Sequence, residues 1–169
     1  MRSAITAIVA SALALAVGAC GFQLRGTATL PFDTLYLPPT KTAGVALDLK
    51  RNIQSGTRTF VVDDPKKADA VLEFTQETRE KHILSLAASG RVREFQLRYR
   101  VGFRVHDGKG GEFLPAGLVQ LTRDHTFRDS DVLAKETEEQ LLFRDMQFDL
   151  VQQIMRRLAT AQRPKPAAQ

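Results

Sequence analysis

Residues able to carry out covalent or metal chemistry are few in this chain. They comprise one cysteine and three histidines: Cys20, His82, His106 and His125. No histidine has a second ligand at a spacing typical of zinc sites. The pairs His106-Asp107 and Asp124-His125 occupy adjacent positions of predicted strands, where side chains point to opposite faces, so neither pair can form an imidazole–carboxylate couple. We interpret the histidines as solvated strand residues.

Motifs of catalytic and cofactor-binding sites are also missing from the sequence. It contains no G-x-S-x-G elbow, no phosphate-binding glycine loop and no H-E-x-x-H pair. Glu136, Glu138 and Glu139 lie where carboxylates stabilise the start of a helix, so a pair of catalytic acids is not expected there. We predict that the chain is not an enzyme and holds neither a metal ion nor a cofactor.

Basic side chains form a more informative pattern. Five arginines lie along one predicted hairpin: Arg91, Arg93, Arg98, Arg100 and Arg104. Guanidinium groups bind phosphates and carboxylates through paired hydrogen bonds, so this hairpin can bind a phosphorylated ligand or an acidic protein surface. A solvated sheet face explains the same pattern equally well. Lys135 is a separate candidate, just ahead of a predicted helix whose free N–H groups favour an anion.

Composition narrows the class of protein. The chain has 169 residues, of which 43% are hydrophobic and 25% charged, and its 24 Lys and Arg against 19 Asp and Glu give a net charge of +5. These figures are typical of one globular domain and exclude a disordered chain, a disulfide-stapled miniprotein and a multidomain enzyme. The net charge is small for a nucleic-acid-binding protein, so no nucleic-acid partner is expected.

Residues 1–19 predict a cleaved signal peptide. Ala4–Val17 is an apolar run too short for a bilayer core, which needs roughly 20 residues, but suited to a secretory signal. The sequence VGAC at 17–20 is typical of lipoprotein processing, which predicts S-diacylglycerol and N-acyl groups on Cys20. Several acyl chains hold a protein stably on a membrane, and Gly21 is compatible with the periplasmic side of the outer membrane. An ordinary signal peptide with a chance cysteine is the alternative.

One α+β domain is predicted over residues 34–162, after a lipidated tether at 20–33 and before a disordered tail at 163–169. Runs of apolar and β-branched residues predict strands, and strict alternation makes the third of them the clearest. The predicted strands are Thr34–Leu37, Val71–Lys81, Phe95–Val105 and Leu118–Phe127. A further short segment, Thr59–Val62, either joins the sheet or only precedes the next strand.

Two amphipathic helices complete the predicted fold. The first covers 42–56, capped by Thr42, with Val45, Leu49 and Ile53 on one face. The second has an apolar face made by Phe143, Met146, Leu150, Ile154 and Leu158. It begins either after Asp131 or at the capping-box sequence of residues 137–140. Both apolar faces are buried if the two helices cover one face of a largely antiparallel sheet.

Three segments resemble the LptE family of LPS-assembly lipoproteins. CGFQLRG at residues 20–26, followed by Leu30-Pro31, is similar to the mature start of that family. Ser89-Gly90 followed by EFQL at 94–97 resembles its central hairpin. LAKE at 133–136 and an amphipathic helix ending with RRL at 156–158 resemble its C-terminal half. The resemblance extends over nearly all of the chain after residue 19.

The resemblance implies a fold and partners. The fold is a two-layer α/β sandwich of two helices and four mostly antiparallel strands. The function is that of an outer-membrane lipoprotein that plugs the barrel LptD in a 1:1 complex, assists its assembly and binds lipopolysaccharide during delivery to the cell surface. A plug in a polar lumen should expose charged rather than apolar surface. The alternative is a periplasmic lipoprotein without a barrel partner, which binds a small ligand or supports an envelope enzyme.

The resemblance also suggests roles for individual residues. Lys135 matches a lysine of the family's Leu-Ala-Lys segment, which implies contact with lipopolysaccharide. Ala88 stands where the family can carry a basic residue before the hairpin turn, so Arg91 or Arg93 would have to replace it. The candidates for contact with the barrel are the three arginines farther along the hairpin: Arg98, Arg100 and Arg104.

Overall fold

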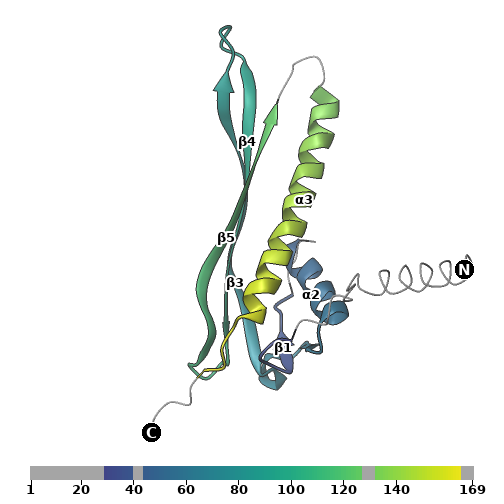
Figure 1. The fold of residues 1–169 in the computed structure, drawn as a ribbon, viewed down its shortest axis with the longest axis vertical. Coiled ribbons are helices and arrows are strands. Elements are labelled where there is room, and N and C mark those ends of the chain that lie inside the picture. Colours follow the sequence, from purple (N-terminus) through teal and green to yellow (C-terminus); the bar gives the residue numbers. More distant parts are fainter. Residues whose placement is uncertain (1–28, 40–43, 127–131, 165–169) are drawn as a thin grey trace, which may run out of the picture.

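A computed structural model describes residues 29–39, 44–126 and 132–164. In chain order its elements are β1 (Thr34–Tyr36), α2 (Val45–Gly56), β2 (Phe60–Val62), a 3-10 turn (Pro65–Lys67), β3 (Ala70–Leu86), β4 (Val92–His106), β5 (Glu112–Thr126) and α3 (Val132–Ala159). The strands form one sheet in the order β2-β1-β3-β4-β5, and both helices lie on the same side of it (Figure 1). The predicted α+β class and the position of the helices are confirmed.

The sheet differs from the prediction because it has five strands and is mixed. β1 pairs in parallel with β2 on one side and with β3 on the other. A crossover helix returns the chain to the end of the sheet where the first strand began, so the strands that it connects run parallel. α2 makes this connection between β1 and β2. The prediction of four mostly antiparallel strands is therefore wrong at this edge, where the short segment after α2 becomes the fifth strand.

Three long antiparallel strands make up the rest of the sheet. β3, β4 and β5 contain 17, 15 and 15 residues, which at about 3.3 Å per residue is roughly 50 Å. β3 and β4 extend beyond their predicted ranges at both ends, and β5 begins before its predicted start at Leu118. Register shifts between Phe74 and Gln76 and again after Ile83 interrupt the alternation of β3. At the first shift Gly102 of β4 lies so close to Thr75 that a Cβ atom would be 2.4 Å from the Thr75 hydroxyl.

The core lies between the sheet and the helices, as the sequence periodicity predicts. Alternate residues of β4 are fully buried: Leu97, Tyr99, Val101, Phe103 and Val105. Against them pack Val45, Leu49 and Ile53 of α2 and Met146, Leu150, Ile154 and Leu158 of α3. Apolar residues at a spacing of two in a strand and of three or four in a helix share one face, so these positions were predictable from local sequence.

The packed part of the chain begins earlier and ends later than predicted. Leu30 and Phe32, within the predicted tether, are buried, and the Phe32 ring meets Phe113 edge-on at 5.5 Å. After α3, the Gln162 amide donates to the Phe113 carbonyl (3.1 Å) and Arg163 Nε donates to the Pro31 carbonyl (2.7 Å). Two apolar residues around a proline are too short a pattern to predict burial. The predicted signal peptide, Cys20 and residues 165–169 of the predicted tail lie outside the described residues.

Helix boundaries also differ from the predictions. α3 begins at Val132, so the capping-box sequence at 137–140 lies inside it, and Lys135 belongs to its first turn rather than preceding it. α2 begins at Val45 after Gly44, and the predicted caps Thr42 and Asp131 lie outside the described residues. Neither helix in the described part of the chain is both long enough and apolar enough to cross a bilayer.

Candidate functional site

The sheet face opposite the helices carries the three arginines predicted to contact a barrel. They occupy even positions of β4, whose odd positions form the core. Arg100 and Arg98 both pair with Glu80 of β3, the latter at 3.8 Å between Nη1 and Oε2. Arg104 Nε donates to Glu73 Oε2 at 2.7 Å. Three arginines of β4 therefore pair with two carboxylates of β3 and form a polar surface.

Two histidines flank these pairs. His82 lies with its Nε2 3.0 Å from Glu80 Oε2 and is exposed, as predicted for a solvated strand residue. Hydrogen bonds from His82 and Arg100 hold the pKa of Glu80 below its usual range. His106 is half-buried, and its Nδ1 accepts a hydrogen bond from the Gly108 amide at 3.0 Å.

His125 contradicts the prediction of a solvated histidine. It is only 2% exposed, and neither ring nitrogen has a hydrogen-bond partner among the described residues. Its Nδ1 lies 3.6 Å from Glu138 Oε1 in the first turns of α3. Val119, Leu121 and His125 occupy odd-numbered positions of β5 and therefore lie on the same face of the strand, which faces the helices. That alternation was visible in the sequence and could have indicated burial.

Lys135 is held by the same glutamate. Its Nζ donates to Glu138 Oε2 at 2.6 Å, and the lysine side chain is 19% exposed. The hydrogen bond from Lys135 is the main reason why the pKa of Glu138 lies below its usual range. A second pair joins this part of α3 to β3, with Lys81 Nζ 2.5 Å from Glu139 Oε2. Lys135 is thus a paired cation on a helix fixed to the hairpin.

The β3–β4 hairpin turn carries the other two predicted ligand residues. The Gly90 amide donates to the Ala87 carbonyl at 2.9 Å, and Gly90 has φ +80°, which favours glycine there. Arg91 and Arg93 follow the turn and are exposed. The turn and the start of α3 lie at the same end of the molecule (Figure 1). The structure therefore places both parts of the predicted lipopolysaccharide site at one end.

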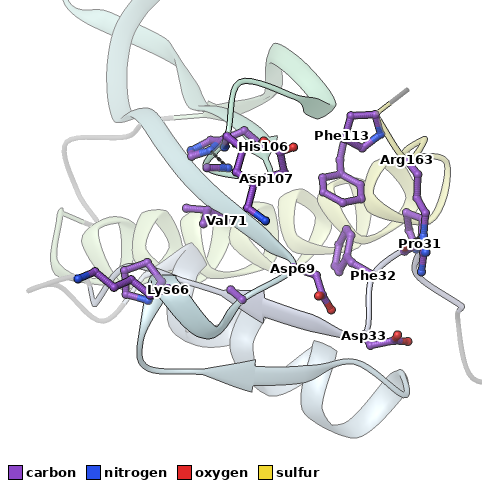
Figure 2. Close-up of a pocket in the computed structure, with 15 residues that line it drawn as sticks. Pro31, Phe32, Asp33, Lys66, Asp69, Val71, His106, Asp107, Phe113 and Arg163 are labelled. Carbon is purple, nitrogen blue, oxygen red and sulfur yellow. Dashed lines mark hydrogen bonds between the residues drawn. The ribbon is translucent and has the colours of Figure 1, made fainter. Parts of the chain in front are cut away.

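A cavity of about 790 Å³ lies at the opposite end of the sheet (Figure 2). Three of its charged groups, those of Asp69, Asp107 and Arg163, bind other parts of the chain. Asp69 accepts hydrogen bonds from the amide (2.9 Å) and hydroxyl (2.8 Å) of Thr34, and the hydroxyl bond is the main cause that lowers the Asp69 pKa. Asp107 accepts from the amides of Lys109 (2.7 Å) and Gly111 (2.8 Å), which lowers its pKa. These carboxylates stabilise the strand ends and loops, so the cavity does not favour a small-ligand site.

A metal site has no support in the described residues, where no three His, Cys, Asp or Glu side chains gather to hold an ion.

The sequence did not predict the exposure of aliphatic side chains near the hairpin turn. Ile83, Leu84 and Leu86 are 59%, 47% and 57% exposed. An apolar run in a strand usually indicates burial, so only the structure could show that no described element covers this segment.

Known proteins resemble the chain in both sequence and fold. Two relatives named LPS-assembly lipoprotein LptE match over 95% of this chain. The one from Photorhabdus laumondii is 25% identical with 88% of its length covered, and the one from Yersinia pestis is 28% identical with 78% covered. A solution structure of an uncharacterized lipoprotein B from Nitrosomonas europaea is 42% identical, with a TM-score of 0.71 over 82% of this chain and 90% of that one.

The family model described as LptE, lipopolysaccharide-assembly, matches residues 32–158. This range extends from the residues before β1 to the last turn of α3. It therefore includes every strand of the sheet, all of α2 and nearly all of α3. The chain therefore belongs to the LptE family of lipopolysaccharide-assembly proteins.

Proposed function

We propose that the chain is an outer-membrane lipoprotein that plugs an LptD-type barrel, assists its assembly and binds lipopolysaccharide during delivery to the cell surface. The observation that carries this proposal is the family match over residues 32–158. Cys20 would bear the S-diacylglycerol and N-acyl groups after removal of residues 1–19, which would place the domain on the periplasmic side of the membrane. The protein performs no bond-making chemistry in this proposal.

The sheet face opposite the helices would contact the barrel. A barrel lumen is polar, and Arg98, Arg100 and Arg104 with their paired carboxylates present hydrogen-bonding groups without a large apolar patch. Arg98, Arg100 and Glu80 are half-buried, whereas Arg104 and Glu73 are more exposed, so a carboxylate of a partner can replace the β3 carboxylate at least cost at Arg104. The face is therefore suited to a wet, polar interface.

The hairpin end would bind the lipopolysaccharide. Lipid A carries phosphate groups, which guanidinium and ammonium groups bind through charge-assisted hydrogen bonds. Arg91 and Arg93 are exposed near the turn, and Lys135 lies in the first turn of α3 at the same end. At Lys135 a phosphate would compete with Glu138 for the ammonium group.

Extraction in mild detergent tests the partnership. We expect the lipidated chain to co-elute with a barrel protein in a 1:1 ratio. The triple change Arg98→Glu, Arg100→Glu and Arg104→Glu should reduce that co-elution, while Arg156→Glu on the exposed side of α3 should not. Recovery of the wild-type chain alone, with no barrel partner, would favour the free-standing lipoprotein instead.

Charge reversal tests the ligand site. Lys135→Glu together with Arg91→Glu should weaken binding of purified lipopolysaccharide by at least tenfold, because two cations are replaced by groups that repel phosphates. Unchanged affinity of this double variant would show that the ligand binds elsewhere.

A further inference from the structure

The end of the β3–β4 hairpin projects beyond the rest of the described fold. The last residue of β5, Thr126, pairs with Glu94, and Glu94 pairs with Ser85 of β3, so residues 86–93 form a ribbon of two strands with no third strand beside it among the described residues. Figure 1 shows this ribbon extending past the end of β5 and past the start of α3. A two-stranded ribbon in water has no second layer in which to bury apolar side chains.

A group of aliphatic side chains lies where this ribbon leaves the three-stranded part of the sheet. The exposed residues of β3 before position 83 are all polar, whereas Ile83, Leu84 and Leu86 are 59%, 47% and 57% exposed. Register shifts on both sides of Ser85 break the alternation of the strand. Bulges redirect side chains, so neighbouring positions can expose apolar groups together. Contiguous exposed apolar residues of this kind mark interaction surfaces.

The chemistry around the group indicates an acylated anion as its occupant. Arg91 and Arg93 are exposed on the same ribbon, and the nearby carboxylate of Glu94 accepts a hydrogen bond from the Ser85 hydroxyl at 2.7 Å. Protein interfaces concentrate their binding energy in Trp, Tyr and Arg, with Leu under-represented. Aliphatic side chains beside arginines instead match a ligand with acyl chains next to phosphates.

We propose that Ile83, Leu84 and Leu86, the aliphatic tip, bind the acyl chains of lipid A, while the adjacent arginines face its phosphates. This inference rests on the proposed function and adds to it a contact between the hairpin and the apolar part of the ligand. Covering the exposed half of one such side chain corresponds to about a three- to tenfold gain in affinity.

A fluorescence experiment tests the contact directly. The chain contains no Trp, so Leu86→Trp introduces a single reporter at the tip, and Phe148→Trp, at a side chain that is 61% exposed on α3, is the matched control. Both would be made in the full chain with Cys20→Ser, so that its own lipid cannot supply an acyl environment. On addition of lipid A with brominated acyl chains, we expect the emission of the Leu86→Trp variant to move to shorter wavelength and to be quenched, with no change for the control.

An affinity measurement separates this inference from the proposed function. Each of Ile83→Ser, Leu84→Ser and Leu86→Ser should weaken lipid A binding about three- to tenfold, while Leu141→Ser, at an exposed position of α3, should not. If wild type binds lipid A and the tip variants bind equally well, the inference is wrong and the proposed function stands. If wild type does not bind lipid A, both fail. Equal fluorescence changes with phosphatidylglycerol vesicles would identify a bilayer as the occupant and overturn the proposal.

Discussion

Lys135 and the arginines near the hairpin turn differ in their surroundings. Lys135 is bound by Glu138, which also faces the buried His125 ring. Arg93 lies on the exposed ribbon. In a binding site that uses both, a phosphate would bind a solvent-exposed guanidinium on the ribbon, whereas at α3 it would compete with the Glu138 carboxylate for Lys135.

Removing that competing carboxylate should strengthen ligand binding. Glu138→Gln keeps the shape of the side chain but removes its charge, so Lys135 becomes available to a phosphate, and lipid A affinity should rise by about three- to tenfold. Titration with lipid A measures this. Glu136→Gln, an equal change of net charge at an exposed neighbouring position, is the control, and an equal gain in both variants would show that only overall charge matters.

Acid should reduce the stability that the Asp69 carboxylate gives to the start of β1, where it binds Thr34. The hydroxyl of Thr34 is the main cause that lowers the Asp69 pKa from 3.8. A carboxyl group whose pKa is lower in the folded state contributes stability above its unfolded pKa and loses it as the pH falls through the folded value. Asp69→Asn should cost about 1 kcal/mol at neutral pH, after allowance for solvent screening. The difference from wild type should vanish in acid, as followed by urea unfolding at several pH values, with Asp33→Asn as the control.

At the scale of secondary structure, a polar network joins the two helices to the sheet. Arg79 of β3 donates to the Tyr99 hydroxyl (2.9 Å) and to Gln147 Oε1 of α3 (2.6 Å). Gln147 Nε2 in turn donates to Asp48 of α2 at 2.6 Å. Burial, aided by a hydrogen bond to Glu77, raises the pKa of the Tyr99 phenol. The network therefore links α3 to α2 and to the sheet at the edge of the apolar core, where Tyr99 meets polar side chains.

Loss of the central guanidinium should destabilise the packing of both helices. Arg79 also lies over the Tyr99 ring, 4.5 Å from its centroid. Arg79→Met keeps the aliphatic stem but removes these contacts and leaves Gln147 without a donor, so the free energy of unfolding should fall by about 1–3 kcal/mol. Arg144→Met, an exposed position of α3, should change it by less than about 0.5 kcal/mol. Equal stability of both variants in chemical denaturation would show that the network contributes nothing measurable.

At the scale of the whole molecule, the packed core and the projecting ribbon are separate parts. The core residues of β3 and β4 face the helices, whereas residues 86–93 have neither a third strand nor a helix beside them in the described part of the chain. The first described residues and the last residues of α3 lie at the opposite end (Figure 1), and residues of both segments line the cavity or adjoin it. Since the long strands span roughly 50 Å, the ribbon reaches that far from the end that follows the predicted lipid anchor.

Shortening the hairpin should therefore separate ligand binding from folding. Replacing residues 84–94 by Asn-Gly connects the paired positions Ile83 and Phe95 through a two-residue turn. Unfolding stability should change by less than about 1 kcal/mol, and co-elution with the barrel should persist, while lipid A affinity should fall by at least tenfold. Loss of the barrel together with the ligand would mean that the ribbon is needed for assembly of the complex.

Local periodicity explains which features were predictable. The alternation over residues 95–105 and the helical spacing of Val45, Leu49 and Ile53 depend only on near neighbours in the chain, and these faces are buried as predicted. The Ser89-Gly90 turn was likewise visible in the sequence. Family membership also followed from the sequence, through short motifs spread over the chain.

Features that depend on distant residues required the tertiary structure. The parallel pairing of β1 with β2 and β3, the glutamate partners of Arg98, Arg100 and Arg104, and the approach of Glu138 to His125 all join segments far apart in the chain. The exposure of the aliphatic tip also depends on distant residues, because an apolar run is interpreted as buried unless the arrangement of the other elements leaves it uncovered.

By itself the sequence determined the faces of the helices and strands, because those follow from the geometry of each element. Strand order, charge pairing and the uncovered hairpin end were decided by which elements meet in three dimensions, which no local pattern encodes.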